Sequence, residues 1–342
     1  MATFCMQTLG CEVSAIHTVN YSNHVGYRTF TGRKTTPEEV ADLYAGLKTA
    51  RLDHFDMMLS GYCPTAATVE QVGKIGRDAK FRASTKPGSF FWVLDPVMGD
   101  NGRLYVAEET VPAYKGLLQS ADLILPNQFE VEVLSGVKIT GLGSMEEAVR
   151  KLHQEYTLPH VLITSIRLPT TPGSDRDNDK AELSLIGSTA TSDNRPRLFR
   201  VTVPALPVFF SGTGDMFAAL LVARLRQAAA QAGLLEIASW RSPDDVAAQD
   251  LPLAKATEMV LASMHAVLKD TAAHYERVKK GLDEETELNE GKGEEGAKER
   301  EMERHLRLTR AAEVRVVRNA RALREPLDLG DFKAEAVNVS DS

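Results

Sequence analysis

Residues 209–215 read Phe-Phe-Ser-Gly-Thr-Gly-Asp, and an almost unbroken apolar helical pattern follows at once over residues 216–230. Two glycines of this stretch, Gly212 and Gly214, leave the backbone open to close approach by phosphate oxygens. Free N–H groups and the positive end of the helix dipole favour negative charge at the same point. The stretch therefore predicts an anion-binding turn at the start of a buried helix.

Asp215 stands at the start of that helix. The helix dipole favours its carboxylate form, beside the place where a phosphoryl group would sit. An alcohol held between Asp215 and a γ-phosphate would lose its proton as it attacks, which is the chemistry of a small-molecule kinase. An aspartate is also an ordinary helix cap, and Gly-x-Gly turns before helices are common. Both interpretations remain open for the turn alone, and candidates elsewhere favour the kinase.

Composition limits the class of protein. The chain has 342 residues, 43% hydrophobic and 25% charged, so it can bury a full core, and we expect one domain over residues 1–342. A net charge of -7 with no basic face argues against nucleic acid as a partner. The three cysteines form no CxxC pair, which argues against a disulfide framework or a structural zinc site. With neither a membrane-spanning apolar run nor a signal-peptide pattern, the sequence favours a cytoplasmic location and leaves the nucleus open.

Strand-like and helical runs alternate along the chain, which is typical of an α/β fold with a mostly parallel sheet and helices on both faces. Continuously apolar runs indicate buried parallel strands. Two β-rich runs after residue 181 read instead as an antiparallel addition. The expected strands are 12–20, 55–60, 90–94, 122–125 and 160–164, followed by the antiparallel pair 182–188 and 197–203.

Helix starts are also legible. Thr36 to Glu39 reads Thr-Pro-Glu-Glu, the order of a capping box with proline in the first turn, and Ser144 to Glu147 repeats the box. Residues 3–9 read as a helix closed by Gly10 that has no strand before it, whereas doubly wound folds start with a strand.

Two polar segments interrupt the pattern. Residues 236–252 are expected to connect two helices. Residues 283–304 are dense in Glu, Lys and Arg, so we expect a solvated insertion or a mobile helix there.

Carboxylates and amides follow two of the expected strands. Asp95 and Asp100 come after residues 90–94, where Mg²⁺ would bind in an open α/β sheet, although Asp-Pro and Asp-Asn-Gly also form turns. Asn127 and Glu130 lie beyond residues 122–125 and could orient phosphate and metal-bound water. Their spacing alone favours a helix cap with its third-position partner.

Hydroxyl and aromatic side chains complete the candidates. Thr164 and Ser165 close a strand and offer hydroxyls to a phosphate or a cation, or simply form a turn. Residues 21–27, Tyr-Ser-Asn-His-Val-Gly-Tyr, form a polar aromatic loop that could close over an aromatic substrate, with His24 either on a ring substituent or solvated. Tyr62 would be a stacking partner or part of the core edge.

In order and spacing, these segments together resemble the pyridoxal kinase family. They are Tyr-Ser-Asn-His-x-Gly-Tyr from residue 21, Ser-Gly-Tyr from residue 60, Asp-Pro-Val-Met-Gly-Asp from residue 95, Pro-Asn-Gln-Phe-Glu from residue 126, Ile-Thr-Ser from residue 163 and Gly-Thr-Gly-Asp from residue 212. The resemblance covers nearly the whole chain. It implies a ribokinase-like three-layer α/β/α fold and transfer of the γ-phosphoryl group of ATP to the 5'-hydroxyl of pyridoxal, pyridoxine or pyridoxamine, in vitamin B6 salvage.

The resemblance also implies a role for each candidate. Asp215 would be the base, and Gly212 with Gly214 would hold the transferring charge. It further implies Mg²⁺, another divalent ion being an alternative, K⁺ or Na⁺ as an additional ion, and a homodimer. The remaining implied residues are Asp95, Asp100 and Glu130 around the metal and phosphates; Asn127, Glu130, Thr164, Ser165, Thr213 and Tyr105 on the nucleotide; and Val19, Tyr21, His24 and Tyr62 at the pyridine ring.

Three departures from the family pattern bear on function. Val25 and Leu125 each stand where the family usually has a threonine, in the substrate pocket and near the monovalent cation respectively. The family's first strand and Gly-rich turn have no counterpart in the sequence, so we expect an N-terminal extension in the working protein. The alternatives are a related kinase of a hydroxymethylpyrimidine, sugar or nucleoside alcohol, and a non-catalytic protein that binds nucleotide or vitamer.

Overall fold

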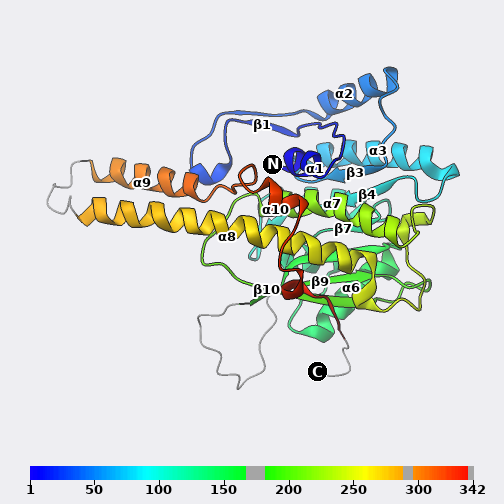
Figure 1. Ribbon diagram of the computed structural model, residues 1–342. Coiled ribbons are helices and arrows are strands. Elements are labelled where there is room, and N and C mark those ends of the chain that lie inside the picture. The colour runs from blue at the N-terminus through cyan, green and yellow to red at the C-terminus, as the bar shows by residue number, and fades with distance from the viewer. Residues whose placement is uncertain (167–181, 288–295, 338–342) are drawn as a thin grey trace.

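The computed structural model describes residues 1–166, 182–287 and 296–337. Its centre is a sheet of seven strands with helices on both faces (Figure 1). Within the described residues, no helix is long and apolar enough to cross a membrane.

The main sheet combines a parallel half with an antiparallel half. β3, β4, β7 and β8 run parallel to one another, whereas β9, β10 and β11 pair antiparallel. The expected antiparallel addition is thereby confirmed. In spatial order the strands are β11 (Glu335–Ala336), β10 (Leu198–Pro204), β9 (Glu182–Thr189), β8 (His160–Ile166), β7 (Leu123–Ile124), β4 (Phe91–Leu94) and β3 (Met57–Ser60).

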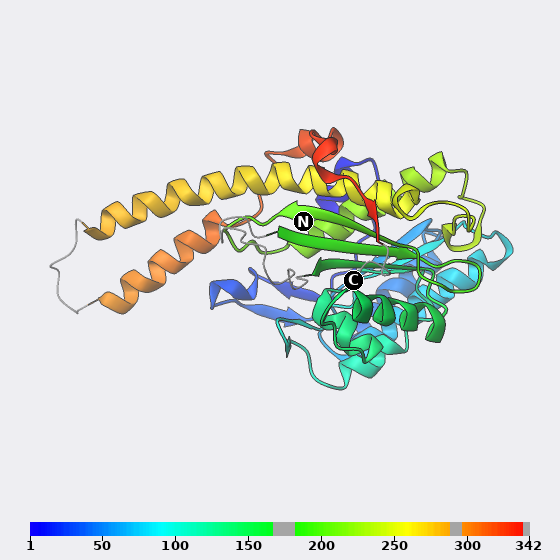
Figure 2. The same ribbon diagram turned by 90° about the horizontal axis from the view of Figure 1, so that it is seen from below.

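Two layers of helices enclose this sheet, as Figure 2 shows edge-on. One face carries α1 (Ala2–Thr8), α7 (Thr213–Gln231) and α8 (Pro252–Glu287), with α10 (Ala320–Arg324) beside them. The other face carries α3 (Ala66–Arg82), α4 (Thr110–Lys115), α5 (Gln128–Ser135) and α6 (Leu142–Glu155). The remaining helices are α2 (Pro37–Thr49) and α9 (Ala297–Ala311), and the short 3-10 turns are η1 (Val25–Tyr27), η2 (Ala83–Thr85), η3 (Ala238–Trp240), η4 (Ala248–Asp250) and η5 (Leu329–Phe332).

β4 shows how the three layers hold together. Phe91 and Val93 belong to the apolar cluster with α7 and α8, whereas Trp92 and Leu94 belong to the cluster with α3 to α6. All four side chains are buried, as expected of a parallel strand covered on both faces. Burial on both faces is the reason why this strand appears in the sequence as a continuous apolar run.

The expected strand at residues 12–20 is largely wrong. Only β1 (Val19–Tyr21) is a strand, and it pairs with β2 (Gly32–Lys34) in a separate two-stranded sheet. β3 is the last strand of the main sheet on this side, and residues 12–17 have no strand partner within the described residues. A β-prone run forms a strand only where its backbone groups find partners, and local composition does not provide them.

The capping signals have different outcomes. Thr36 and Glu39 form both bonds of the expected capping box at α2. Ser144 is not a cap: Gly141 caps α6, and the Ser144 hydroxyl accepts from the Gly141 N–H at 3.1 Å. Because Gly141 has no side chain, only this one bond of a capping box forms, and the box expected at Ser144 is wrong.

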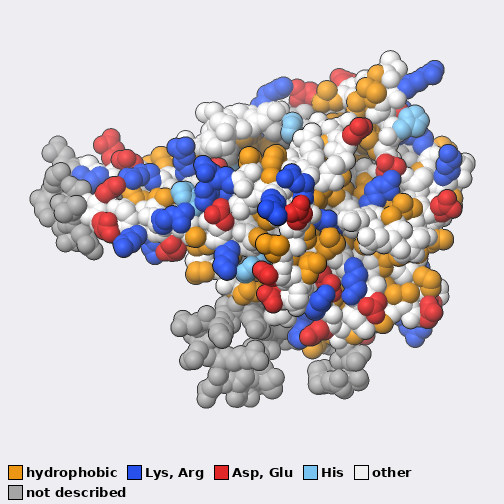
Figure 3. Space-filling model, in the orientation of Figure 1, with side chains coloured by type: hydrophobic (Ala, Val, Ile, Leu, Met, Phe, Trp, Pro, Cys, Tyr) orange, Lys and Arg blue, Asp and Glu red, His pale blue; other side chains and the backbone are white. Residues whose placement is uncertain are grey.

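The two polar segments connect and extend the helices. Residues 236–252 join α7 to α8 through η3 and η4. Residues 283–287 end α8 and 297–304 begin α9, while 288–295 lie outside the described residues. Arg304 with Asp283 (2.5 Å) and Arg307 with Glu285 (2.7 Å) link the two helices, which project side by side from the body (Figures 1 and 2). Side chains of both charges cover this projection in Figure 3.

Candidate active site

The candidate residues after β4 and β7 and near the end of β8 meet at one edge of the sheet. The N–H of Leu125 donates to the carbonyl of Leu94 at 3.0 Å, and the N–H of Thr164 donates to that of Pro126 at 3.0 Å. These bonds continue the parallel pairing to the points where the strands end. The segments that carry Asp95, Asn127 and Thr164 are therefore neighbours, at the edge where α/β sheets bind ligands.

Asn127 and Glu130 form a complete capping box at α5. The Glu130 N–H donates to Oδ1 of Asn127 at 3.0 Å, and the Asn127 N–H donates to Oε2 of Glu130 at 2.9 Å. The other carboxylate oxygen, Oε1, accepts from the N–H groups of Met98 (2.8 Å) and Gly99 (3.3 Å). The cap interpretation is confirmed, and both oxygens of Glu130 are engaged by backbone donors.

The same box fixes the loop that carries Asp100. The Nδ2 amide of Asn127 donates to the carbonyl of Gly99 at 2.7 Å. β5 (Gly99–Asp100) then pairs with β6 (Arg103–Leu104) across Asn101 and Gly102, both in the left-handed region at φ 49° and 77°. Two such residues define a tight hairpin turn, so the turn interpretation is also correct. The pKa of Tyr105 is raised by burial and by the charges of Asp100 and Glu130, which places this exposed ring beside them.

The turn before α7 has the predicted backbone. Gly212 is the N-cap residue, with φ 82°, and Asp215 lies in the first turn. Thr213 and Gly214 stand between them as the first two helical residues. A left-handed cap favours glycine, so the sequence and the conformation agree here.

Two opposing effects act on the pKa of Asp215. Burial raises its pKa above the usual range, while the positive charge of the chain's amino group lowers it. The side chain is open to solvent on one side, so the surrounding protein atoms on its other sides cause the rise. Desolvation disfavours the carboxylate form, whereas the helix dipole favours it.

Three carboxyl groups gather at this edge. Burial raises the pKa of Asp95 well above its usual range, and the charges of Glu130 and Asp215 raise it further. The pKa of Glu130 is raised to about 7, again mainly by burial. Asp215 therefore lies within electrostatic reach of Asp95, the residue directly after β4. Among the described residues, however, no three His, Cys, Asp or Glu side chains are grouped closely enough to hold a metal ion by themselves.

Thr164 and Ser165 lie in an irregularity of the sheet. The pairing of β8 with β9 shifts between Ile163 and Ile166, opposite Ile186 and Ser184. Two residues of β8 thus face one residue of β9, which is a β-bulge. Bulges redirect side chains and are frequent beside active sites.

The aromatic candidates form a second group, here called the aromatic wall: Val19 and Tyr21 on β1, His24 in the loop after it and Tyr62 after β3. Tyr21 contributes to a rise in the pKa of Tyr62, after burial, so the two phenols are close together. The Thr18 hydroxyl donates to the carbonyl of Tyr62 at 2.7 Å, which joins β1 to the segment after β3. Nδ1 of His24 accepts from the Gly26 N–H at 3.1 Å, so His24 caps η1. Val19 begins the same strand as Tyr21.

Two contacts to this wall were not found from the sequence. The Tyr27 hydroxyl donates to Oε1 of Glu313, and Nε2 of His305 lies 3.0 Å from the carbonyl oxygen of Gly26. His305 lies in α9 and Glu313 just beyond it, at the other end of the chain. Tyr27 was part of the quoted loop, but no local pattern singles out Glu313 or His305.

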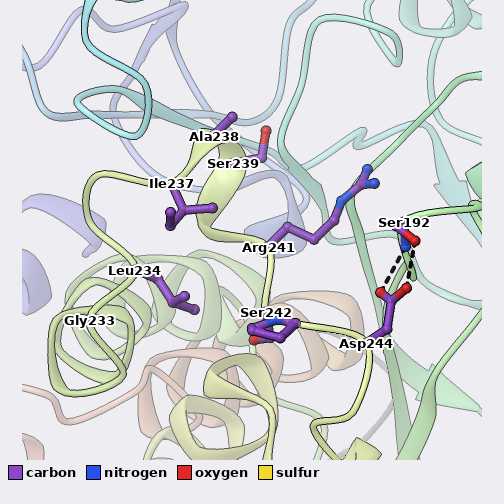
Figure 4. Close-up of a pocket in the computed structure, with 10 residues that line it drawn as sticks. Ser192, Gly233, Leu234, Ile237, Ala238, Ser239, Arg241, Ser242 and Asp244 are labelled. Atoms are coloured by element: carbon purple, nitrogen blue, oxygen red, sulfur yellow. Dashed lines mark hydrogen bonds between the residues drawn. The ribbon is translucent and has the colours of Figure 1, made fainter.

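A hollow lies elsewhere and is separate from these residues. It measures about 730 Å³ and is lined by Ser192 and by residues of the segment from Gly233 to Asp244; the Ser192 N–H and hydroxyl both bond to Asp244 (Figure 4). Nε2 of His160, the first residue of β8, lies 2.7 Å from the carbonyl oxygen of Ser239. This hollow is therefore at the amino ends of the strands, away from the candidate residues.

Comparisons with known proteins identify the family. A phosphomethylpyrimidine kinase family model matches residues 79–233. Pyridoxal kinase of Arabidopsis thaliana is 32% identical over 81% of this chain and 78% of its own length, and that of Homo sapiens is 35% identical over 65% and 70%. A pyridoxal kinase structure from Leishmania donovani, in complex with ADP and pyridoxamine, superposes with a TM-score of 0.72 and 27% identity, covering 98% of this chain and 93% of that one. The chain belongs to the pyridoxal kinase family of the ribokinase-like superfamily.

Proposed function

We propose that the chain transfers the γ-phosphoryl group of ATP to the 5'-hydroxyl of pyridoxal, and also of pyridoxine and pyridoxamine. The product from pyridoxal is pyridoxal 5'-phosphate, as in vitamin B6 salvage. Family membership supports the reaction. The observation that carries it is the position of Asp215, behind the left-handed turn at Gly212 and within electrostatic reach of Asp95.

Asp215 is proposed as the general base. Its carboxylate would take the proton of the 5'-hydroxyl while the oxygen forms a bond to the γ-phosphorus, and the bond from that phosphorus to the β,γ-bridging oxygen breaks to release ADP. A raised pKa makes the carboxylate a better proton acceptor. The N–H groups after Gly212 and at Gly214 would stabilise the charge on the transferring group.

The nucleotide is proposed to lie across the ends of β7 and β8. Asn127, Thr164 and Ser165 would bind it there, with Thr213 on the phosphates and Tyr105 over the opposite side. Glu130 is proposed to act mainly through its bonds, because both its oxygens hold the backbone of residues 98–99 and 127 in place.

Mg²⁺ is proposed to bind beside Asp95 and Asp100. No hydrogen bond or ion pair satisfies the Asp95 side chain within the described residues, and two neighbouring carboxyl groups raise its pKa, so the site suits a cation. The ion would neutralise charge on the phosphates when bound. Since too few protein ligands are grouped to hold it alone, phosphate oxygens and water would complete its shell.

The vitamer is proposed to bind against Val19, Tyr21 and Tyr62, with His24 holding the loop that covers it. The decisive experiment incubates the purified chain with pyridoxal and Mg-ATP, with K⁺ or Na⁺ added in separate arms, and follows pyridoxal 5'-phosphate by its absorbance. We expect product from the native chain and almost none from Asp215→Asn. Absence of product under every condition contradicts the proposal.

A related kinase activity is the second candidate. The phosphomethylpyrimidine kinase match and the apolar Val25 in the aromatic loop favour testing it. A panel of pyridoxal, hydroxymethylpyrimidine, a sugar and a nucleoside separates the two, and preference for any but a B6 vitamer contradicts the first proposal. By family membership we also propose a homodimer, which sedimentation equilibrium tests.

A further inference from the structure

α9 and the residues just after it contact two parts of the candidate active site, the aromatic wall and the segment before the Gly212 turn. On one side, the Tyr27 hydroxyl donates to the Glu313 carboxylate, and His305 contacts the carbonyl of Gly26. Both contacts lie in the loop between β1 and β2, the loop that starts at Tyr21. The aromatic wall is therefore held from outside by the far end of the chain.

On the other side, Glu313 pairs with the segment that leads into the Gly212 turn. Its backbone forms a parallel bridge with Ser211, the residue before Gly212. One residue thus binds the aromatic loop with its side chain and the segment before α7 with its main chain. Val314, immediately after it, is buried in the apolar cluster of α7 and α8, so the bridge has a rigid support.

We propose that Glu313 is a positioning residue that sets the distance between the vitamer-binding loop and the Gly212 turn. This inference rests on the proposed function. Transfer requires the 5'-hydroxyl to lie between Asp215 and the γ-phosphate. A small displacement of the vitamer-binding loop or of the Gly212 turn would misalign the hydroxyl. Arg310 also lies near Tyr27, since its charge lowers the pKa of that phenol.

Variants that remove the hydrogen bond between Tyr27 and Glu313 measure how much it contributes to turnover. Loss of one hydrogen bond corresponds to roughly 3- to 10-fold. We expect Glu313→Ala and Tyr27→Phe each to raise KM for pyridoxal and lower kcat, with kcat/KM reduced by about that factor or more, while KM for ATP stays within about 2-fold. Glu313→Gln keeps an acceptor oxygen and should restore most of the loss. The double variant Tyr27→Phe/Glu313→Ala should be no worse than the poorer single variant, because both remove one bond.

Several results overturn the assignment. They are a double variant whose loss is the product of the single losses, a Gln variant as poor as Ala, or an equal rise in KM for ATP. Glu301→Ala, which removes an exposed carboxylate from α9, is the matched control and should leave all constants unchanged.

A second measurement does not depend on catalysis. Amide hydrogen exchange over residues 22–30 should be faster in Tyr27→Phe than in the native chain, with exchange in α7 unaltered. If the native chain makes no pyridoxal 5'-phosphate, the proposed function fails while this exchange still tests the contact. Unchanged exchange overturns the contact itself.

Discussion

Asp215 raises the pKa of Asp95, although the two carboxyl groups come from opposite halves of the chain. The helix start and the end of β4 therefore meet at one site. Like charges this close favour a cation between them, or a proton on one of them. Holding the two carboxyl groups this close lowers the stability of the fold when both are charged.

Replacing Asp215 should separate activity from stability. Asp215→Asn is expected to lower kcat by about 10² to 10⁴, because the variant has no proton acceptor. Burial disfavours the carboxylate, so the neutral amide should leave the midpoint of urea unfolding at pH 7 unchanged or higher. Nucleotide affinity, measured by calorimetry, should stay close to the native value. A stable variant with native kcat would exclude Asp215 as the base.

The two glycines of the turn form a matched pair. Gly212 has φ 82°, and an added Cβ would lie 2.9 Å from Cε of Met1, so Gly212→Ala should cost about 1 to 3 kcal/mol of stability. Gly214 has ordinary helical geometry and open space around it, so Gly214→Ala should fold normally. Both substitutions alter the turn that is proposed to hold the transferring group, so both should lower kcat. Thermal unfolding and turnover of both variants check this, and equal stability losses would contradict it.

The capping box at α5 makes a prediction of its own. Asn127→Ala removes the bond to the Glu130 N–H and the bond to the Gly99 carbonyl, and should destabilise the chain by about 1 to 2 kcal/mol. Asn127→Asp keeps the capping oxygen but not the amide donor, so its loss should be smaller. Chemical denaturation of the three proteins measures both. An Ala variant with native stability would show that the box is dispensable.

Two buried histidines predict acid sensitivity. The pKa values of His153 and His160 are lowered to about 4, mainly by burial. The pKa of histidine in the unfolded chain is about 6.5. Below that pH the unfolded chain binds protons at these two positions and the folded chain does not. The contribution of these two groups to the free energy of unfolding is fully present above pH 6.5 and is lost as the pH falls towards 4. Denaturant unfolding across that range should show the slope.

A single variant isolates one histidine. Nδ1 of His153 lies 2.6 Å from the carbonyl oxygen of Leu158, and Nε2 lies 2.8 Å from the Ser188 hydroxyl. His153→Gln should be less stable than the native chain at pH 7.5 but should lose less on acidification. An unchanged slope would mean that His153 does not cause the acid loss.

Much of the fold could be predicted because its signals are local. The buried strand β4 appears as a continuous apolar run, and the Thr36 box occupies four adjacent positions. The Gly212 turn could likewise be predicted from adjacent residues. Residues 12–17 show the limit, since their β propensity is real but their hydrogen-bond partner is a matter of tertiary structure.

The site could be predicted in part for the same reason. Asp95 and Asn127 follow strands and Thr164 lies near the carboxyl end of β8, and the rule that parallel strands present their carboxyl ends together placed the three at one edge. The raised pKa of Asp215 depends on atoms that pack around it from distant segments. The contact between Tyr27 and Glu313 spans 286 positions of the chain, and neither residue carries a pattern that names the other.

β4 has a consequence for how the molecule unfolds. Because its alternate side chains serve both apolar clusters, neither helical layer can melt while the other stays intact. Heating should therefore dismantle the body in one cooperative transition, with the projecting ends of α8 and α9 fraying earlier and independently of it.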